Sequence, residues 1–330
     1  MSEHKLFEIK GLKTFFHTEA GTVKAVNDVS FDIYKGEVLG IVGESGSGKS
    51  VTSLSINRLI PNPPGEIVAG KILYNGVNLL DLSYEEMRKY RGRHISMIFQ
   101  EPMTSLNPVL RILPQMNEVL VEHDGISFDE ATPRSIEMLK AVGIPDPERR
   151  IYDYAHQFSG GMRQRIMIAM ALQCTPSLLI ADEPTTALDV TIQAQILDLM
   201  MDLKDKRKDA AILLITHDLA VIAETCDRVI VMYGGVIQEI ANVHDLFSNP
   251  IHPYTKALMD SIPKMNTQTK RLKALKGMVP SMLELGDECK LCSRFDPTEC
   301  ACGGTTIEPD LSEIETDHFA RINLEILKNE

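Results

Sequence analysis

The sequence lacks a long hydrophobic stretch. Its most apolar runs, such as AAILLI at residues 210–215, are far shorter than the roughly 20 residues of a membrane-spanning helix. The first ten residues, MSEHKLFEIK, contain no apolar core of a secretory signal. We therefore expect the protein to stay in the cytoplasm unless a partner holds it at a membrane.

Basic residues are also in short supply. Among 330 residues, 46 are acidic and 34 are lysine or arginine, which gives a formal net charge of −12. From residue 281 to the end, 12 acidic residues face only 4 basic ones. This balance argues against general binding to nucleic acid, and we interpret the acidic tail as solvated surface.

The order of predicted elements indicates an α/β fold. Short apolar strands alternate with helical patterns between residues 5 and 240, which is typical of a sheet covered by helices. The clearest predicted strands lie at residues 38–42, 177–181, 210–216 and 228–233. We predict one α/β domain over residues 1–240, with a helical insertion at about 102–155. A small C-terminal domain that contains a cysteine cluster follows over residues 241–330.

One glycine-rich loop carries the strongest chemical signal. GESGSGKS at residues 43–50 fits the pattern G-x-x-x-x-G-K-[ST], and it follows an apolar strand and precedes a helical pattern. Glycines let backbone amides turn inward around phosphate oxygens, and the helix presents its positive end to the same anion. The predicted phosphate-binding residues are Gly43, Glu44, Ser45, Gly46, Ser47, Gly48, Lys49 and Ser50. Lys49 would reach the β- and γ-phosphates, and Ser50 would bind Mg²⁺.

Polar residues end three further predicted strands. In SLLIADEP, Asp182 suits the Mg²⁺ shell, and Glu183 suits the base that polarises an attacking water. His217 in LLITHDLA ends a predicted strand and would reach a γ-phosphate, although a lone histidine is more often a structural residue. Gln100 in SMIFQEP would ligate the metal ion through its carboxamide.

A second candidate anion site lies in HQFSGGMRQR. The Ser159 hydroxyl and the amides of Gly160 and Gly161 stand at the start of a predicted helix, where its dipole favours an anion. Because the phosphate loop already binds one nucleotide, this second site would bind a phosphate from another source.

Together these motifs resemble the ATP-binding-cassette (ABC) ATPases. GESGSGKS, FQEP, FSGGMRQR, LLIADEP, TALD and ITHD stand in the family order, and the resemblance covers about residues 5–265. It implies a P-loop nucleotide-binding domain with a helical subdomain, which hydrolyses ATP with Mg²⁺. It also implies a head-to-tail pair of ATPases, in which the second site binds the partner's ATP. Phe158 and Met162 depart from the usual outer residues of that motif.

Two further positions carry over from the family singly. Phe16 resembles the aromatic residue that stacks on adenine; Phe15 is the alternative, and a core role is a third. Asp189 in TALD resembles the family residue that communicates across the dimer.

The subclass resembles the ATPases of oligopeptide and dipeptide importers, a group that includes nickel importers. The stretch NPIHPYTKAL lies outside the catalytic motifs, so it indicates the importer subgroup more specifically than those motifs do. The resemblance implies two transmembrane permease subunits, a paralogous partner ATPase, an extracytoplasmic peptide-binding protein, and a peripheral position on the cytoplasmic face of the membrane. Import of nickel or another solute, or a non-transport ABC machine without a membrane partner, are the alternatives.

Four cysteines cluster within fourteen residues, at positions Cys289, Cys292, Cys300 and Cys302. Structural disulfides are rare in the cytoplasm, and four thiolates can bind Zn²⁺ or a [4Fe–4S] cluster. This cysteine segment resembles the C-terminal cluster of importer ATPases, which can hold iron and sulfur. The cysteines of those ATPases are more widely spaced. We predict a [4Fe–4S] cluster, with zinc or free thiols as alternatives.

Overall fold

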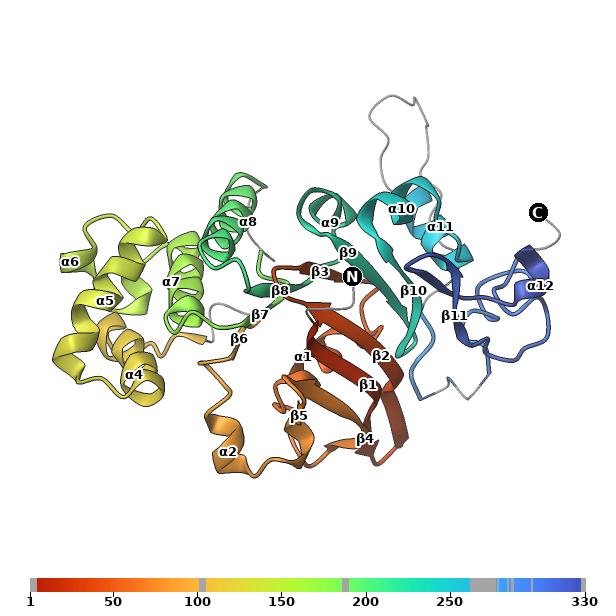
Figure 1. The fold of residues 1–330 in the computed structure, drawn as a ribbon, viewed down its shortest axis with the longest axis horizontal. Helices are drawn as coiled ribbons and strands as arrows, with labels where there is room; N and C mark the ends of the chain where they lie inside the picture. Colours follow the sequence, from red (N-terminus) through yellow and green to blue (C-terminus); the bar gives the residue numbers. More distant parts are fainter. Residues whose placement is uncertain are drawn as a thin grey trace. The chain divides into compact units, whose positions relative to one another are not determined.

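The chain forms two compact units, which are described separately. The computed structural model describes residues 5–100, 105–185, 190–261, 277, 279–283, 285, 288–297 and 299–327. The first unit comprises residues 1–6, 33–37 and 81–215, and the second comprises residues 7–32, 38–80 and 216–330. Figure 1 shows the elements of both units coloured along the sequence. Within the described residues, no helix combines the length and apolarity needed to cross a membrane.

The first unit is built on a parallel sheet with the strand order β8-β7-β6. All residues of β7 and β8 are buried, so both read as continuous apolar runs, as strands covered on both faces do. Its elements are α2 (Tyr84–Arg88), β6 (Ile95–Ile98), α4 (Ile112–Asp124), α5 (Phe128–Ala141), α6 (Pro147–Arg150), α7 (Gly160–Leu172), β7 (Leu178–Asp182), α8 (Val190–Asp205) and β8 (Ala211–Ile215).

Helices α4, α5 and α6 lie within the stretch predicted as a helical insertion. The hydroxyl of Ser127 accepts the Glu130 amide, and the Glu130 side chain returns to Ser127, which forms a capping box that starts α5. Inside, the Asn117 side chain accepts from the Ser135 hydroxyl at 2.7 Å, and Ser135 accepts from Gln173 at 2.7 Å. This buried polar chain fixes α4 and α5 against the end of α7.

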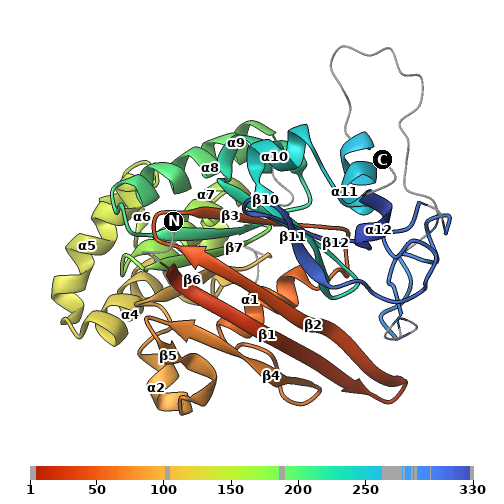
Figure 2. The ribbon, with the colours of Figure 1, turned by 45° about the vertical axis from the view of Figure 1, so that its right-hand side comes forward.

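The second unit contains two sheets. An antiparallel sheet has the order β2-β1-β4-β5, and Figure 2 shows β1 and β2 lying side by side. The other sheet has the order β11-β12-β10-β9-β3, with β3 parallel to β9. The strands are β1 (Lys5–Thr18), β2 (Gly21–Tyr34), β3 (Val38–Val42), β4 (Gly65–Tyr74), β5 (Val77–Asn78), β9 (Arg228–Tyr233), β10 (Val236–Asn242), β11 (Leu311–Glu315) and β12 (His318–Arg321). The helices are α1 (Lys49–Ile56), α9 (Leu219–Thr225), α10 (Val243–Ser248), α11 (Pro253–Asp260) and α12 (Leu324–Leu327).

The predicted strands are confirmed. The stretches predicted at residues 38–42 and 228–233 coincide with β3 and β9, and β7 and β8 differ from their predicted bounds by one residue at each end. Valine, isoleucine and leucine fill these strands, and such residues pack well on a pleated surface that is buried on both faces. The α/β fold is therefore evident from the apolar runs alone.

A buried carboxylate joins three segments of the second unit. Glu239 in β10 is fully buried and accepts from the His318 ring at 2.7 Å and from the amides of Ile251 and His252 at 2.7 and 3.1 Å. His252 in turn accepts the Tyr254 amide through Nδ1 and caps α11, with Pro253 at the first helical position. Glu239 thus attaches both α11 and β12 to β10.

Candidate nucleotide and metal sites

The phosphate loop, residues 43–50, leaves the buried strand β3 and enters α1. Gly43 and Gly48 have φ angles of 152° and 101°. A Cβ at Gly43 would lie 2.2 Å from the Met232 carbonyl oxygen, and one at Gly48 would lie 2.4 Å from that of Ala25. Only glycine fits both positions, because any side chain would clash with backbone. Within the described residues no side chain caps the start of α1, and the amides at a helix start suit an anion.

Lys49 lies folded back within its own loop. Its ammonium group donates to the carbonyl oxygens of Gly43 at 2.7 Å and Glu44 at 3.0 Å, and it lies 3.5 Å from the Ser47 hydroxyl. The lysine is 6% exposed. A buried ammonium held by two carbonyl oxygens can exchange these partners for phosphate oxygens of higher negative charge, which is the behaviour expected of the loop lysine.

Glu44 is held by groups from the C-terminal part of the chain. Arg294 forms a two-pronged ion pair with the Glu44 carboxylate, and its Nη2 donates to Oε1 at 3.2 Å. The Glu44 amide donates to the Tyr254 hydroxyl at 3.1 Å, and that hydroxyl donates to Oε2 at 3.3 Å. Burial raises the pKa of Tyr254, and the Glu44 charge raises it further, so this hydroxyl keeps its proton.

The carboxyl ends of β6 and β7 bring two predicted residues together. The strands are parallel and in register, with Ile98 beside Ala181, so Gln100 and Glu183 emerge at the same edge. The Gln100 amide donates to the Glu183 carboxylate at 3.0 Å. Asp182, the last residue of β7, is 3% exposed. Carboxylate and amide oxygens are ligands that Mg²⁺ prefers, so Asp182 and Gln100 fit that ion.

Glu183 has an unusual backbone conformation. Its φ angle is 47°, in the left-handed region, and its amide donates to the Ile215 carbonyl of β8 at 2.9 Å. A non-glycine residue pays about 1–3 kcal/mol for such a conformation, and these residues concentrate at functional sites. The strain turns Glu183 away from the direction of its strand.

The Ser159 motif opens α7 as predicted. The Ser159 hydroxyl accepts the Met162 amide at 3.3 Å, and Ser159 and Gly160 are exposed. One turn later the buried Gln164 donates to the carbonyl oxygen of Pro184, directly after Glu183. This bond connects the second anion site to the end of β7. The sequence offered one signal for it, a glutamine inside an otherwise apolar helical face.

His217 is exposed, and Phe16 is half-buried. His217 is exposed between β8 and α9, and the next residue, Asp218, caps α9 by accepting the Ala220 amide at 2.8 Å. Phe16 is half-buried in β1 and pairs with Gly65 of β4; its neighbour Phe15 is also half-buried. Adenine stacking by Phe16, with Phe15 as the alternative, therefore stays a prediction. Asp189 lies outside the described residues.

The four clustered cysteines converge on one point. Their Sγ atoms lie within 4.8 Å of one another, and only Cys292 is exposed. The Cys300 sulfur lies 3.5 Å from that of Cys289, 3.8 Å from that of Cys292 and 3.5 Å from that of Cys302. One ion with tetrahedral Zn–S bonds of about 2.3 Å sets sulfur–sulfur distances of about 3.8 Å. The spacing therefore fits a single tetrahedral ion.

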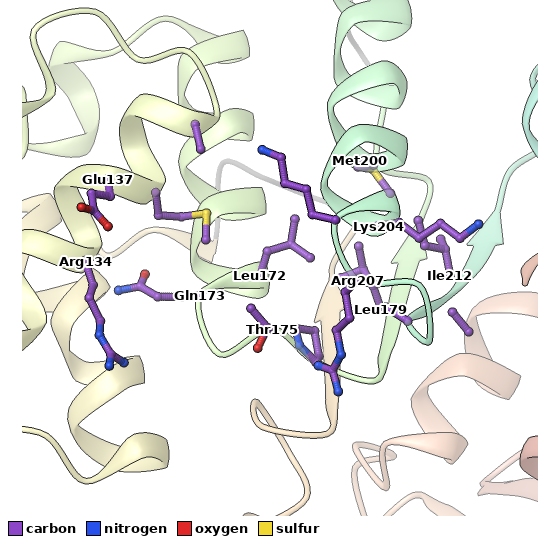
Figure 3. A pocket seen from close by; sticks show the side chains of 16 residues that line it. Arg134, Glu137, Leu172, Gln173, Thr175, Leu179, Met200, Lys204, Arg207 and Ile212 are labelled. Carbon is purple, nitrogen blue, oxygen red and sulfur yellow. The ribbon is translucent and has the colours of Figure 1, made fainter. Parts of the chain in front are cut away.

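A separate cavity lies in the first unit and has a volume of about 450 Å³ (Figure 3). Apolar side chains such as Leu172, Leu179 and Met200 line its interior. Its charged lining residues are Arg134, Glu137, Lys204, Lys206 and Arg207. None of the residues predicted to bind nucleotide is among those that line it, so this cavity is not the predicted ATP site.

Comparison with known proteins agrees with these motifs. A model of the ABC transporter family matches residues 26–186, and one named "Oligopeptide/dipeptide transporter, C-terminal region" matches residues 238–302. A probable peptide ABC transporter ATP-binding protein of Sinorhizobium fredii is 52% identical over 316 residues, which cover 96% of this chain and 93% of that protein. The oligopeptide transport ATP-binding protein OppD of Bacillus subtilis is 53% identical over 279 residues, which cover 84% of this chain and 78% of OppD.

A solved structure extends this comparison. The ATP-binding cassette MJ0796, in a dimeric post-hydrolysis state bound to ADP and Pi, has a TM-score of 0.64 and 28% identity. The match covers 72% of this chain and 98% of that cassette. The chain belongs to the ATP-hydrolysing, ATP-binding proteins of ABC transporters, in the group that carries the oligopeptide/dipeptide transporter C-terminal region.

Proposed function

We propose that this chain is the ATP-hydrolysing subunit that powers import of dipeptides or oligopeptides across the cytoplasmic membrane. The observation that carries the proposal is its likeness, over nearly the whole chain, to ATP-binding proteins named for peptide transport. The match includes the C-terminal region, which lies outside the catalytic motifs. The chain acts on the cytoplasmic face, where two permease subunits hold it.

Residues of the phosphate loop bind the nucleotide. Lys49 releases the carbonyl oxygens of Gly43 and Glu44 and binds the β- and γ-phosphates, while the loop amides surround the same oxygens. Phe16 stacks on the adenine ring. Ser50, Gln100 and Asp182 would hold the Mg²⁺ that accompanies ATP and neutralises charge on its phosphates.

Glu183 is the general base for hydrolysis. Its carboxylate takes a proton from the attacking water, and the Gln100 amide that donates to it fixes its orientation. His217 contacts the γ-phosphate. Phosphoryl transfer depends mainly on positioning and charge neutralisation, so these few side chains are sufficient.

A second ATPase, most simply a paralogue, completes each site. Ser159, Gly160 and Gly161 bind the γ-phosphate of the partner's ATP, and they reach it from the exposed start of α7. Closure of the pair excludes water from both sites. The Gln164–Pro184 bond then connects the γ-phosphate contact of one nucleotide to the base that serves the other. An external binding protein delivers the peptide to the permeases.

The cysteine cluster holds a metal centre in this proposal. The sulfur spacing favours a single tetrahedral ion such as Zn²⁺, which would supply a structural crosslink. A [4Fe–4S] cluster places each cysteine on a different iron, so the four sulfurs would have to move apart to bind it. Metal analysis of anaerobically purified protein separates about one zinc per chain from about four irons with acid-labile sulfide.

Purification of tagged protein from solubilised membranes tests the transport function. We expect two multi-span membrane proteins and a second ABC ATPase to co-purify, and ATP-dependent uptake of labelled peptides after reconstitution with the binding protein. Recovery of this chain with only non-membrane partners would overturn the transport role and leave the ATPase chemistry intact.

A further inference from the structure

Glu44 connects the phosphate loop to the C-terminal region of the second unit through its amide and its carboxylate. Its amide donates to Tyr254, its carboxylate binds Arg294 and Tyr254, and its carbonyl oxygen accepts from the Lys49 ammonium at 3.0 Å. Glu44 therefore lies between the lysine predicted to bind phosphate and two side chains that the catalytic motifs do not include.

Arg294 is built into this position. Its side chain is 2% exposed, its guanidinium lies 5.7 Å above the Tyr233 ring, and it also donates to the Gly277 carbonyl at 3.3 Å. Burial alone would lower the pKa of Arg294, but its hydrogen bonds with Glu44 and the charge of Glu44 raise it overall. A buried guanidinium requires a charged partner, and here that partner belongs to the phosphate loop.

Tyr254 is equally fixed. It is fully buried, its ring lies 4.8 Å from that of Tyr233, and its amide donates to the cap residue His252. This tyrosine belongs to the stretch NPIHPYTKAL, whose likeness to importer ATPases was noted from the sequence without a role. Its hydroxyl is the point where α11 meets the loop.

We propose that Arg294 and Tyr254 are positioning residues for the phosphate loop, so that the cysteine-bearing C-terminal region sets the nucleotide affinity through Glu44. Arg294 follows the cysteine Cys292 by two residues, so the segment that carries the metal ligands also carries this cation. By holding Glu44, the pair fixes the carbonyl oxygen against which Lys49 rests and the direction of the loop amides. The proposal depends on the nucleotide role of the loop stated above.

Binding of AMP-PNP with Mg²⁺, measured by calorimetry on the full chain, tests this inference. A hydrogen bond to a charged group contributes more than a neutral one, so we expect Arg294→Gln to weaken binding about tenfold and Tyr254→Phe about threefold. Glu44→Gln should match Arg294→Gln within about twofold. Arg294→Lys, which keeps the charge and loses the fork, should be intermediate.

A double-mutant cycle separates positioning from a general structural effect. If Arg294 acts through Glu44, the variant with both substitutions binds AMP-PNP no more weakly than the worse single variant. Arg134→Gln is the matched control, because Arg134 forms an exposed ion pair with Asp124 in the other unit. It should bind as the parent does. Thermal unfolding and metal content, measured on each variant, show whether it is folded.

Two outcomes would overturn the inference. One is a folded Arg294→Gln variant with the parent's affinity, and the other is a double variant whose loss equals the product of the single losses. If Arg294→Gln does not fold, Tyr254→Phe decides, because it keeps the Arg294–Glu44 ion pair in place. Lys49→Ala tests the nucleotide site itself. If this variant bound AMP-PNP with the parent's affinity, the proposed function would be refuted, and not the positioning role of Arg294.

Discussion

Two glutamates at the carboxyl ends of buried strands have opposite surroundings. Glu44 follows β3 and is bound by a buried arginine and a tyrosine, whereas Glu183 follows β7 and accepts from the neutral amide of Gln100. Glu44 has its backbone held at both the amide and the carbonyl, while Glu183 adopts a strained left-handed conformation.

The two carboxylates differ in the charge of one bonding group, which is a guanidinium at Glu44 and a neutral amide at Glu183. A carboxylate paired with a cation loses that pairing if it takes up a proton, so Glu44 suits a fixed structural role. The Gln100 amide is neutral, so its hydrogen bond orients the Glu183 carboxylate without neutralising the charge that a general base requires. Residue type and position after a strand are therefore insufficient to assign a role, because the groups bound to the carboxylate also matter.

The largest expected effect comes from Glu183→Gln. It removes the proton acceptor and keeps the shape, so ATP turnover should fall at least about 100-fold while AMP-PNP affinity stays within about threefold. Steady-state hydrolysis in the purified transporter complex and calorimetry measure the two quantities. The same substitution at Glu44 is the matched comparison: Glu44→Gln should weaken AMP-PNP affinity, whereas Glu183→Gln should lower turnover. Near-normal turnover in Glu183→Gln would remove the base assignment.

Lys49→Ala should weaken nucleotide binding by about tenfold or more, because charge-assisted hydrogen bonds to phosphate are lost. Equilibrium binding of AMP-PNP measures this directly. Lys35→Ala, an exposed lysine outside the loop, should leave the affinity unchanged. An unaltered affinity in Lys49→Ala would mean that the loop lysine does not contact the phosphates.

Cys300→Ser tests whether the support of Glu44 by Arg294 depends on a metal bound to the cysteine cluster. Cys300 is fully buried, and its sulfur lies within 3.8 Å of the other three. Loss of this ligand should release the metal, lower the unfolding temperature by several degrees, and weaken AMP-PNP binding about threefold through Arg294. Cys226→Ser, a buried cysteine outside the cluster, should keep the metal content. Retained metal in Cys300→Ser would contradict the site.

Acid should weaken the packing of α11, the helix that carries Tyr254 and is capped by His252. Burial lowers the pKa of His252 to about 4, against the opposing charge of Glu239, while Arg321 and Lys256 lower it further. The unfolded chain then binds more protons than the native one between about pH 6.5 and 4. The stability contributed by neutral His252 is complete above pH 6.5 and is lost as the pH falls toward 4, by about 2–3 kcal/mol at most.

Thermal unfolding between pH 7.5 and 5 measures this dependence. His252→Asn keeps an oxygen that can cap α11 and removes the titration, so its unfolding temperature should fall less on acidification. His244 is exposed on α10, and His244→Asn should behave as the parent does. Equal acid sensitivity of His252→Asn and the parent would assign the effect to other groups.

The sequence predicted the strands and the places of the motifs along them, because apolar runs and fixed spacings are local properties. The phosphate loop, Asp182 and Glu183 lie at strand ends as expected. Arg294 and Glu44 are 250 residues apart, and no local pattern indicates that they meet. Cysteine spacing along the chain also does not distinguish a zinc site from an iron–sulfur site, because that choice depends on sulfur–sulfur distances, which only folding sets.

Glu239 limits how such ATPases can be recombined. A chimera joined at residue 240 would take β10, which continues to Asn242, from one parent and His318 and His252 from another. A parent without a ring donor at position 318 would leave this buried carboxylate without one of its three donors, at a cost of several kcal/mol. A graft of the C-terminal region alone is therefore expected to fold well only where it supplies such a donor at position 318.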